Sequence, residues 1–187
     1  ERRITLLNKD IARINAMQKL SAAQKTSLVA TAQLNINNLT TLKAKIAADT
    51  DIETLKTDIK SITQSYRIFA LVHPQGRIIA AADRILTTSE NLVTVQGKLQ
   101  VRITAAQTAG KDVTTMNTAI AEIAAKSADA KVQAQNAINL VASLTPDQGN
   151  DTISQSNKAA LVNAQTAIKA ARVDLEIASK DAHTINK

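Results

Sequence analysis

The sequence predicts an all-α protein built from elongated antiparallel helical bundles. Apolar residues recur at alternating steps of three and four along almost the whole chain, which is the spacing of helical stripes and not of strands. Aromatic residues make up only 1% of the 187 residues, so the core must be built from Ile, Leu, Val and Ala. Such side chains pack as thin seams between helices, which favours long bundles over a thick globular interior.

Three shorter helices are expected before His73. The second of them begins at Ser21, because Ser21 and Gln24 form the pattern of a capping box. Asp49 and Asp51 are competing N-caps for the third helix. The stripes of these helices are formed by Ile4, Leu7, Ile11 and Ile14, by Leu28, Ala32, Asn35, Leu39, Leu42 and Ile46, and by Ile52, Leu55, Ile59, Ile62, Tyr66 and Phe69.

A structural joint is expected where the third helix ends, near Val72. Pro74 pushes His73 away from helical dihedrals, while Pro74 itself suits the first turn of the next helix. Gly76 loosens the same turn. We therefore expect a break or a sharp kink between His73 and Pro74. If the chain only kinks there, the third and fourth helices form one rod that is similar to tandem spectrin-type repeats in geometry alone.

Four further residues are candidates for holding this joint or for a contact patch beside it. Tyr66 and Phe69 lie three residues apart on the stripe of the third helix, where they anchor the core or, as the alternative, form an exposed recognition patch. Asp83 and Arg84 either clamp the joint, through a charged hydrogen bond to the backbone or to Arg67, or are solvated.

Three longer helices are expected after Pro74, each of about 33 residues and therefore about 50 Å long. Gly97 interrupts the first of them and is expected to mark a close approach of helices. Gly110 and Asp112 form a tight turn between the first two. Pro146 and Gly149 exclude helix between the last two. The stripes comprise Ile78, Ala82, Ile85, Ser89, Leu92, Gln96, Leu99, Ile103 and Ala106, then Val113, Met116, Ile120, Ile123, Ser127, Ala130, Ala134, Ala137, Val141 and Leu144, then Leu161, Ala164, Ile168, Ala171, Leu175, Ala178, Ala182 and Ile185.

The helices therefore divide into two consecutive three-helix units, residues 1–73 and residues 74–187. The first unit has shorter helices that bury less apolar area, so it is expected to be the less stable of the two.

Several short runs around the joint resemble sequences of uncharacterised exported all-helical proteins of small-genome bacteria. The runs are Tyr66–Val72, Pro74 with Gly76 and Arg77, Ala81–Arg84 and Ala109–Val113. The resemblance implies an extracellular or cell-surface location and no known activity. The chain also begins at Glu1 without a Met, as a processed mature form or an excised fragment would. The cytoplasm is the alternative location.

The residues that carry chemistry are not grouped in the sequence. His73 and His183 fall in different units and form no ligand pair, no Gly-rich loop precedes a helix to hold phosphates, and the absence of Cys excludes thiolate zinc sites. We expect neither catalytic residues nor a metal site nor a cofactor. The longest apolar runs, Ile68–Val72 and Ile78–Ala82, are far below the roughly 20 residues of a membrane-spanning helix.

Three classes of function fit this pattern. The first is a structural or protein-interaction bundle, on or outside the cell, with a protein or cell-surface partner. The second is a polyanion binder, because residues 1–50 hold eight Lys or Arg against three acids within a net charge of +7. Nucleic acid is disfavoured as its ligand, since the chain has few aromatics for base stacking. The third is an amphipathic protein that coats a lipid surface, against which the well-defined caps and turns argue.

Overall fold

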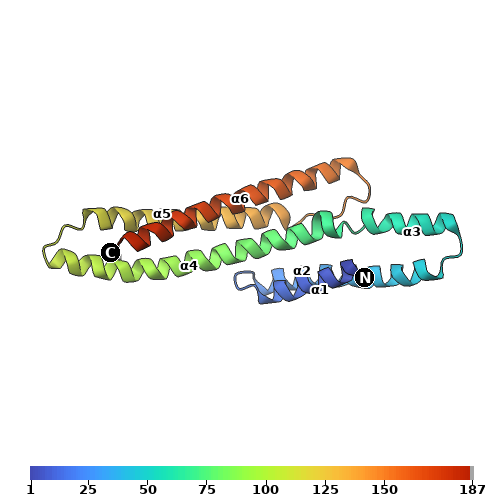
Figure 1. Cartoon of the computed structure of the whole chain (residues 1–187), viewed down its shortest axis with the longest axis horizontal. Helices are drawn as coiled ribbons and strands as arrows, with labels where there is room; N and C mark the ends of the chain where they lie inside the picture. The colour runs from blue at the N-terminus through green and yellow to red at the C-terminus, as the bar shows by residue number, and fades with distance from the viewer. Residues whose placement is uncertain (186–187) are drawn as a thin grey trace.

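The computed structural model describes residues 1–185, and the chain in this range is α-helical without any β-strand. The molecule is long and narrow, with its helices aligned along the long axis (Figure 1). The predicted all-α class is confirmed. The elements are α1 (Arg2–Ala16), α2 (Ala22–Ala48), α3 (Ile52–Gln64), the π-helical segment η1 (Ile68–Val72), α4 (His73–Thr108), α5 (Thr114–Val141) and α6 (Asp151–Ile185).

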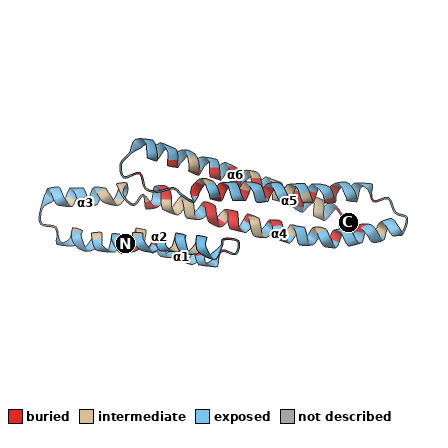
Figure 2. Ribbon diagram, turned by 180° about the vertical axis from the view of Figure 1, so that it is seen from behind, coloured by how far each residue is buried: buried red, intermediate tan, exposed pale blue. Residues whose placement is uncertain are grey.

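The long helices α4, α5 and α6 form a three-helix bundle whose seams are the predicted ones. The sides of these helices that face one another are buried, and the opposite sides are exposed (Figure 2). Small residues on α5 and α6 let these two helices approach closely, because an Ala side chain adds little width between backbones. The buried alanines at this contact include Ala130, Ala134, Ala137, Ala164 and Ala171.

The turn between α4 and α5 follows the sequence signals. Gly110 has a φ of 74°, and the Lys111 N–H donates to the Ala106 carbonyl at 3.0 Å, which closes α4 in a left-handed cap. Asp112 accepts a hydrogen bond from the Thr114 backbone N–H at 2.9 Å.

The expectation for Gly97 is wrong: it is exposed, and a Cβ there would meet no atom within 4 Å. Its place on the solvent side of α4 explains why glycine is tolerated without a packing role.

The first helices dock onto this bundle through α1. Ser21 and Gln24 form the predicted capping box at the start of α2, which fixes the turn between α1 and α2. Ile14, Met17 and Leu20 belong to the same buried cluster as residues of α4, α5 and α6. The end of α1 thus shares a core with the bundle, whereas Leu7 and the buried residues of α2 form a separate cluster with Ile68, and the division at residue 73 stays a prediction.

The predicted joint lies elsewhere than expected. α3 ends at Gln64 and not near Val72, and the chain breaks at Arg67, whose φ of 42° is left-handed. His73 and Pro74 instead belong to a continuous helix that begins with η1. A proline ring clashes with the carbonyl four residues before it and leaves that carbonyl without a donor. The wider π turn over Ile68–Val72 lies directly before Pro74 and makes room for its ring. The helix therefore continues through His73 without a break.

The hairpin of α2 and α3 extends beyond the N-terminal end of α1 and beyond the bundle (Figure 1). Over this length α3 packs on α2 and has no third helix against it, and it buries one residue, Asp58. The apolar stripe of α3 is correspondingly open: Ile52 is 66% exposed and Ile59 is 51% exposed.

Candidate functional site

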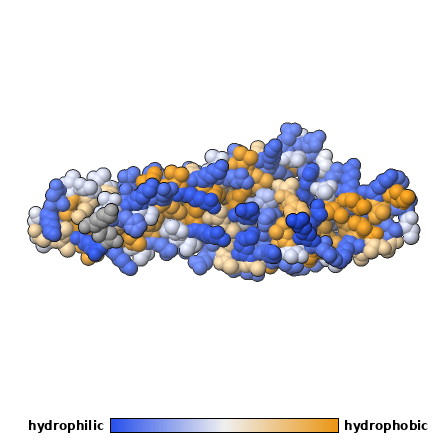
Figure 3. Space-filling view, in the orientation of Figure 1, coloured by the Kyte–Doolittle hydropathy of each residue, from blue (hydrophilic) through white to orange (hydrophobic). Residues whose placement is uncertain are grey.

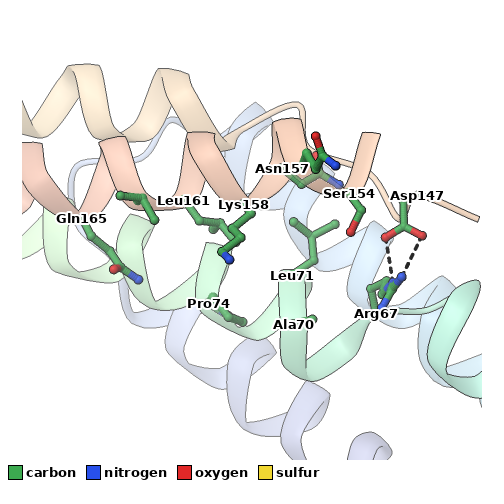
Figure 4. A pocket seen from close by; sticks show the side chains of 12 residues that line it. Arg67, Ala70, Leu71, Pro74, Asp147, Ser154, Asn157, Lys158, Leu161 and Gln165 are labelled. Atoms are coloured by element: carbon green, nitrogen blue, oxygen red, sulfur yellow. Dashed lines mark hydrogen bonds and ion pairs between the residues drawn. The ribbon is translucent and has the colours of Figure 1, made fainter. Parts of the chain in front are cut away.

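Among the described residues, one ion pair joins the start of η1 to the α5–α6 loop, and we call it the clamp. The Arg67 guanidinium pairs with both Asp147 oxygens, with Nε 2.7 Å from Oδ2 and Nη2 donating to Oδ1 at 3.0 Å (Figure 4). Asp147 Oδ1 also accepts the Gly149 backbone N–H at 2.8 Å, and the Gln148 side chain donates to the Ser65 carbonyl at 3.2 Å. The loop thereby holds the break in the chain at both of its ends.

The charge of Asp147 is stabilised by this geometry. The hydrogen bond from Arg67 holds the pKa of the Asp147 carboxyl below its usual range, although burial opposes that shift. Asp147 is 3% exposed. Sequence reasoning identified Pro146 and Gly149 as turn residues but missed Asp147, because its partner is 80 positions away and no local pattern connects the two.

A cavity of about 410 Å³ lies beside the clamp, between the start of α4 and the start of α6. Pro74 and Leu71 line it from one side, and Lys158 and Gln165 from the other (Figure 4). Its carboxylate and guanidinium are already paired with each other. Apolar and polar side chains both line the cavity, and the polar ones include Ser154 and Lys158, which are one helical turn apart on α6.

The predicted aromatic pair separates in the structure. Tyr66 is half-buried, whereas Phe69 is 46% exposed and carries the Arg3 guanidinium 5.1 Å from its ring centroid. The expectation that Phe69 anchors the core is wrong. The break at Arg67 and the wider π turn shift the helical phase, so that Ile68 and Leu71 occupy the buried positions.

His73 faces α1 and meets a buried carboxylate there. Its Nδ1 lies 2.9 Å from Asp10 Oδ2 and 3.1 Å from Asp10 Oδ1, and Arg13 Nη1 donates to Oδ1 at 2.6 Å. Gly76 lies on the same side of α4, where a Cβ would be 3.9 Å from Asp10 Cγ. His183 is exposed on α6. The two histidines are thus not neighbours, and His73 is a structural partner of Asp10.

Asp83 is a clamp, but for the turn between α1 and α2. Its carboxylate accepts the backbone N–H groups of Gln18 at 3.0 Å and of Lys19 at 2.6 Å, and the residue is 6% exposed. These N–H groups lie in the turn, where no helical partner is available to them. Arg84, its neighbour in the sequence, is exposed. Asp83 therefore ties the first hairpin to α4 at a point well away from Arg67.

A second kind of surface lies on the α2–α3 hairpin. We call it the hairpin face, and it comprises Leu42, Ile46, Ile52, Leu55, Ile59 and Ile62. A cavity of about 160 Å³ opens where this face meets Ile4 at the start of α1, and its lining includes the charged residues Glu1, Arg3 and Lys43 as well as apolar side chains. Figure 3 shows hydrophobic residues gathered over this end of the molecule.

The polar groups of the hairpin are incompletely paired. Lys45 donates to Asp58 at 2.9 Å, but the second oxygen of Asp58 is buried without a hydrogen bond, as is one oxygen of Asp49. Burial and the nearby Asp58 carboxylate raise the pKa of Asp49. The hairpin thus combines exposed apolar side chains with two carboxylates that interact with each other.

Two general features complete the description. Within residues 1–185, no group of three or more His, Asp or Glu side chains is placed to hold a metal ion. None of the helices in that range is long and apolar enough to cross a membrane.

Comparisons with known proteins found no matching family model, no similar curated protein and no similar solved structure.

Proposed function

We propose that the protein is a non-catalytic interaction protein whose hairpin face binds an amphipathic helix of a partner protein. The observation that carries this proposal is the exposure of Ile52 and Ile59, on a regular helical stripe, where the hairpin extends beyond the end of α1. Two helices cannot cover each other's apolar stripes completely, and a third helix in the groove between them buries the remainder.

The dimensions and charges of the hairpin define the partner. α3 has 13 residues and is about 20 Å long, so a complementary helix needs about four turns. Between residues 43 and 60 the hairpin has four Lys and four acids, so it is neutral although the whole chain carries +7. A neutral apolar groove selects a helix by its apolar stripe and not by its net charge.

An extracellular or cell-surface setting is part of the proposal. It is supported by the resemblance of the segments around Tyr66 and Pro74 to exported helical proteins. The defined caps at Ser21, Asp51 and Gly110 favour a stably folded bundle over a coat that opens on a lipid surface. A rigid bundle that presents a helix-binding end suits such a setting.

Site-specific photo-crosslinking tests the proposal. A photoreactive residue replaces Ile59 in one variant and Val101 in another; Val101 is 70% exposed on α4 and serves as the matched control. In the native host, position 59 is expected to crosslink to a discrete partner and position 101 is not. Adding Ile52→Glu to the first variant is expected to remove the product.

Absence of any product specific to position 59 would contradict the proposal. A product that consists of two copies of this chain would keep the hairpin face as an interaction surface and identify the partner as a second copy.

A further inference from the structure

A groove runs between α1 and the beginning of α4, which lie parallel to each other. Arg3 meets Phe69, Asp10 meets His73, and Gln18 meets Asp83, in the same order along both helices. Two cavities follow this groove. One, of about 330 Å³, lies between the start of α1 and Phe69, and the other, of about 410 Å³, lies between the end of α1 and the middle of α4.

Cationic side chains form a row along the α1 edge of this groove. Arg2, Lys9 and Arg13 are seven and four residues apart, close to two turns and one turn, so they lie on one side of the helix within about 16 Å. Arg2 and Lys9 line the first cavity, and Arg13 lines the second.

The α4 edge carries a second row of side chains, in which the cations are Arg77 and Arg84. His73, Arg77 and Arg84 follow one another at steps of four and seven, and both arginines are exposed. His73 lines the first cavity and Arg84 lines the second, which places Arg77 between them on the same edge. We call the two rows and the space between them the cationic groove.

The two acids of these segments are buried and paired within the protein, although Asp83 also lines the second cavity. Asp10 and Asp83 are the only acids in residues 2–16 and 73–89, and they are 4% and 6% exposed. Both accept hydrogen bonds within the protein, as described above. Nearby exposed acids stand at the ends, where Glu1 pairs with Lys43 and Glu90 pairs with Lys19. The charged groups presented along the groove are therefore cationic, and Figure 3 shows hydrophilic residues over this middle part of the molecule.

We propose that the cationic groove binds a linear phosphate polymer that lacks bases. Two parallel rows of cations match a chain with regularly spaced negative charges, and the planar fork of arginine suits phosphate oxygens. Nucleic acid fits less well, because single strands are held by stacking on several aromatic faces, and Phe69 is the one aromatic residue that lines the two cavities. The groove is separate from the hairpin face, so this proposal does not depend on the proposed function.

Binding of fluorescently labelled inorganic polyphosphate to the full chain, followed by anisotropy, tests the proposal. Affinity is expected to fall with salt, with a slope of log K against log salt of about −2 to −4, because three to five phosphates release their counterions. The double variant R77Q/R84Q is expected to bind about tenfold more weakly or worse, by loss of two charge contacts. The control K169Q/R172Q, which removes the same charge from exposed positions on α6, is expected to change affinity less than about twofold.

Circular dichroism first establishes that both variants keep the parent helix content, since all four side chains are exposed. A single-stranded DNA oligonucleotide of matched charge is measured in parallel and is expected to bind more weakly than polyphosphate. Equal loss in the two double variants, or no binding at low salt, would overturn the proposal. Tighter binding of the oligonucleotide would overturn it in favour of nucleic acid.

Discussion

Helices α5 and α3 carry the same kind of apolar stripe, but the stripe is buried on α5 and exposed on α3. On α5, Ile120 and Ile123 are 7% and 0% exposed, because α4 and α6 lie against it along its length. On α3, Ile52 and Ile59 are more than half exposed, because α2 is its main neighbour. A regular stripe shows which residues share a face, and the number of neighbouring helices decides whether that face is buried.

Buried polar groups occur in both regions. In the bundle, the Ser89 hydroxyl is fully buried and donates to the Ile85 carbonyl at 2.9 Å. Buried side-chain oxygens without a hydrogen bond occur both in the bundle, at Ser127 and Asp181, and in the hairpin, at Asp49 and Asp58. The difference between the two regions therefore lies in their apolar stripes, which are buried in the bundle and exposed in the hairpin, and not in their polar groups.

Truncating one isoleucine in each region gives the largest expected contrast. Ile123→Ala leaves a cavity in a fully buried seam and is expected to lower the free energy of unfolding by about 3 to 4 kcal/mol. Ile59→Ala removes a half-exposed side chain and is expected to cost about 1 kcal/mol or less. Urea denaturation of the two variants measures both values. Similar losses for the two would show that the hairpin is packed as tightly as the bundle.

The second prediction concerns the attachment of the first hairpin to the bundle. Asp83→Ala leaves the Gln18 and Lys19 N–H groups without their charged acceptor and is expected to cost about 3 kcal/mol. Asp129→Ala, at an exposed carboxylate of α5, is the control and is expected to change stability by about 0.5 kcal/mol or less. Urea midpoints that move equally in the two variants would contradict the role of Asp83 as a clamp.

The third prediction concerns the clamp at the break. The pKa of Asp147 is lowered in the folded protein, so its charged form stabilises the fold above the pKa of a free aspartate, about 3.9, and this stability is lost as pH falls through the lower folded value. Arg67→Gln is expected to reduce stability at neutral pH and to weaken its fall below about pH 4. Thermal melts from pH 7 to pH 2 measure both effects. A parent and a variant with parallel profiles would exclude the clamp as a source of acid sensitivity.

The smallest effect is expected at Phe69. Since its ring is nearly half exposed, Phe69→Ala is expected to change the free energy of unfolding by about 0.5 kcal/mol, far below the 3 to 5 kcal/mol of a buried Phe. Chemical denaturation decides between the two. A loss of several kcal/mol would show that Phe69 anchors η1 after all.

Some parts of the structure are determined by short stretches of sequence, and others depend on residues that are distant in the chain. The seams of α4, α5 and α6, the capping box at Ser21 and the turn at Gly110 follow from spacing and cap residues, and they were predicted. The break at Arg67 was not, because it depends on how the ring of Pro74 displaces the preceding turn and on the distant loop at Asp147. The exposure of Phe69 follows from that displacement. Because the break was not predicted, Phe69 was wrongly predicted to lie in the core.

The sequence also identified Asp83 and His73 as special residues without identifying their partners. Both lie opposite α1, which is more than 60 positions away in the chain. Stripes define helix faces, but they do not define which helix lies opposite or whether it runs parallel. The hairpin face and the cationic groove both depend on that arrangement, so both required the structure.

The central claim is that the apolar stripes of the α4–α6 bundle are buried, whereas the α2–α3 hairpin is incompletely packed. Native-state hydrogen exchange, resolved by residue, tests it most directly, because protection reports the local free energy of opening. Amides of residues 43–62 are expected to exchange with little protection, whereas those of residues 78–103 and 119–141 are expected to approach the protection of global unfolding. Equal or greater protection in residues 43–62 would contradict the claim.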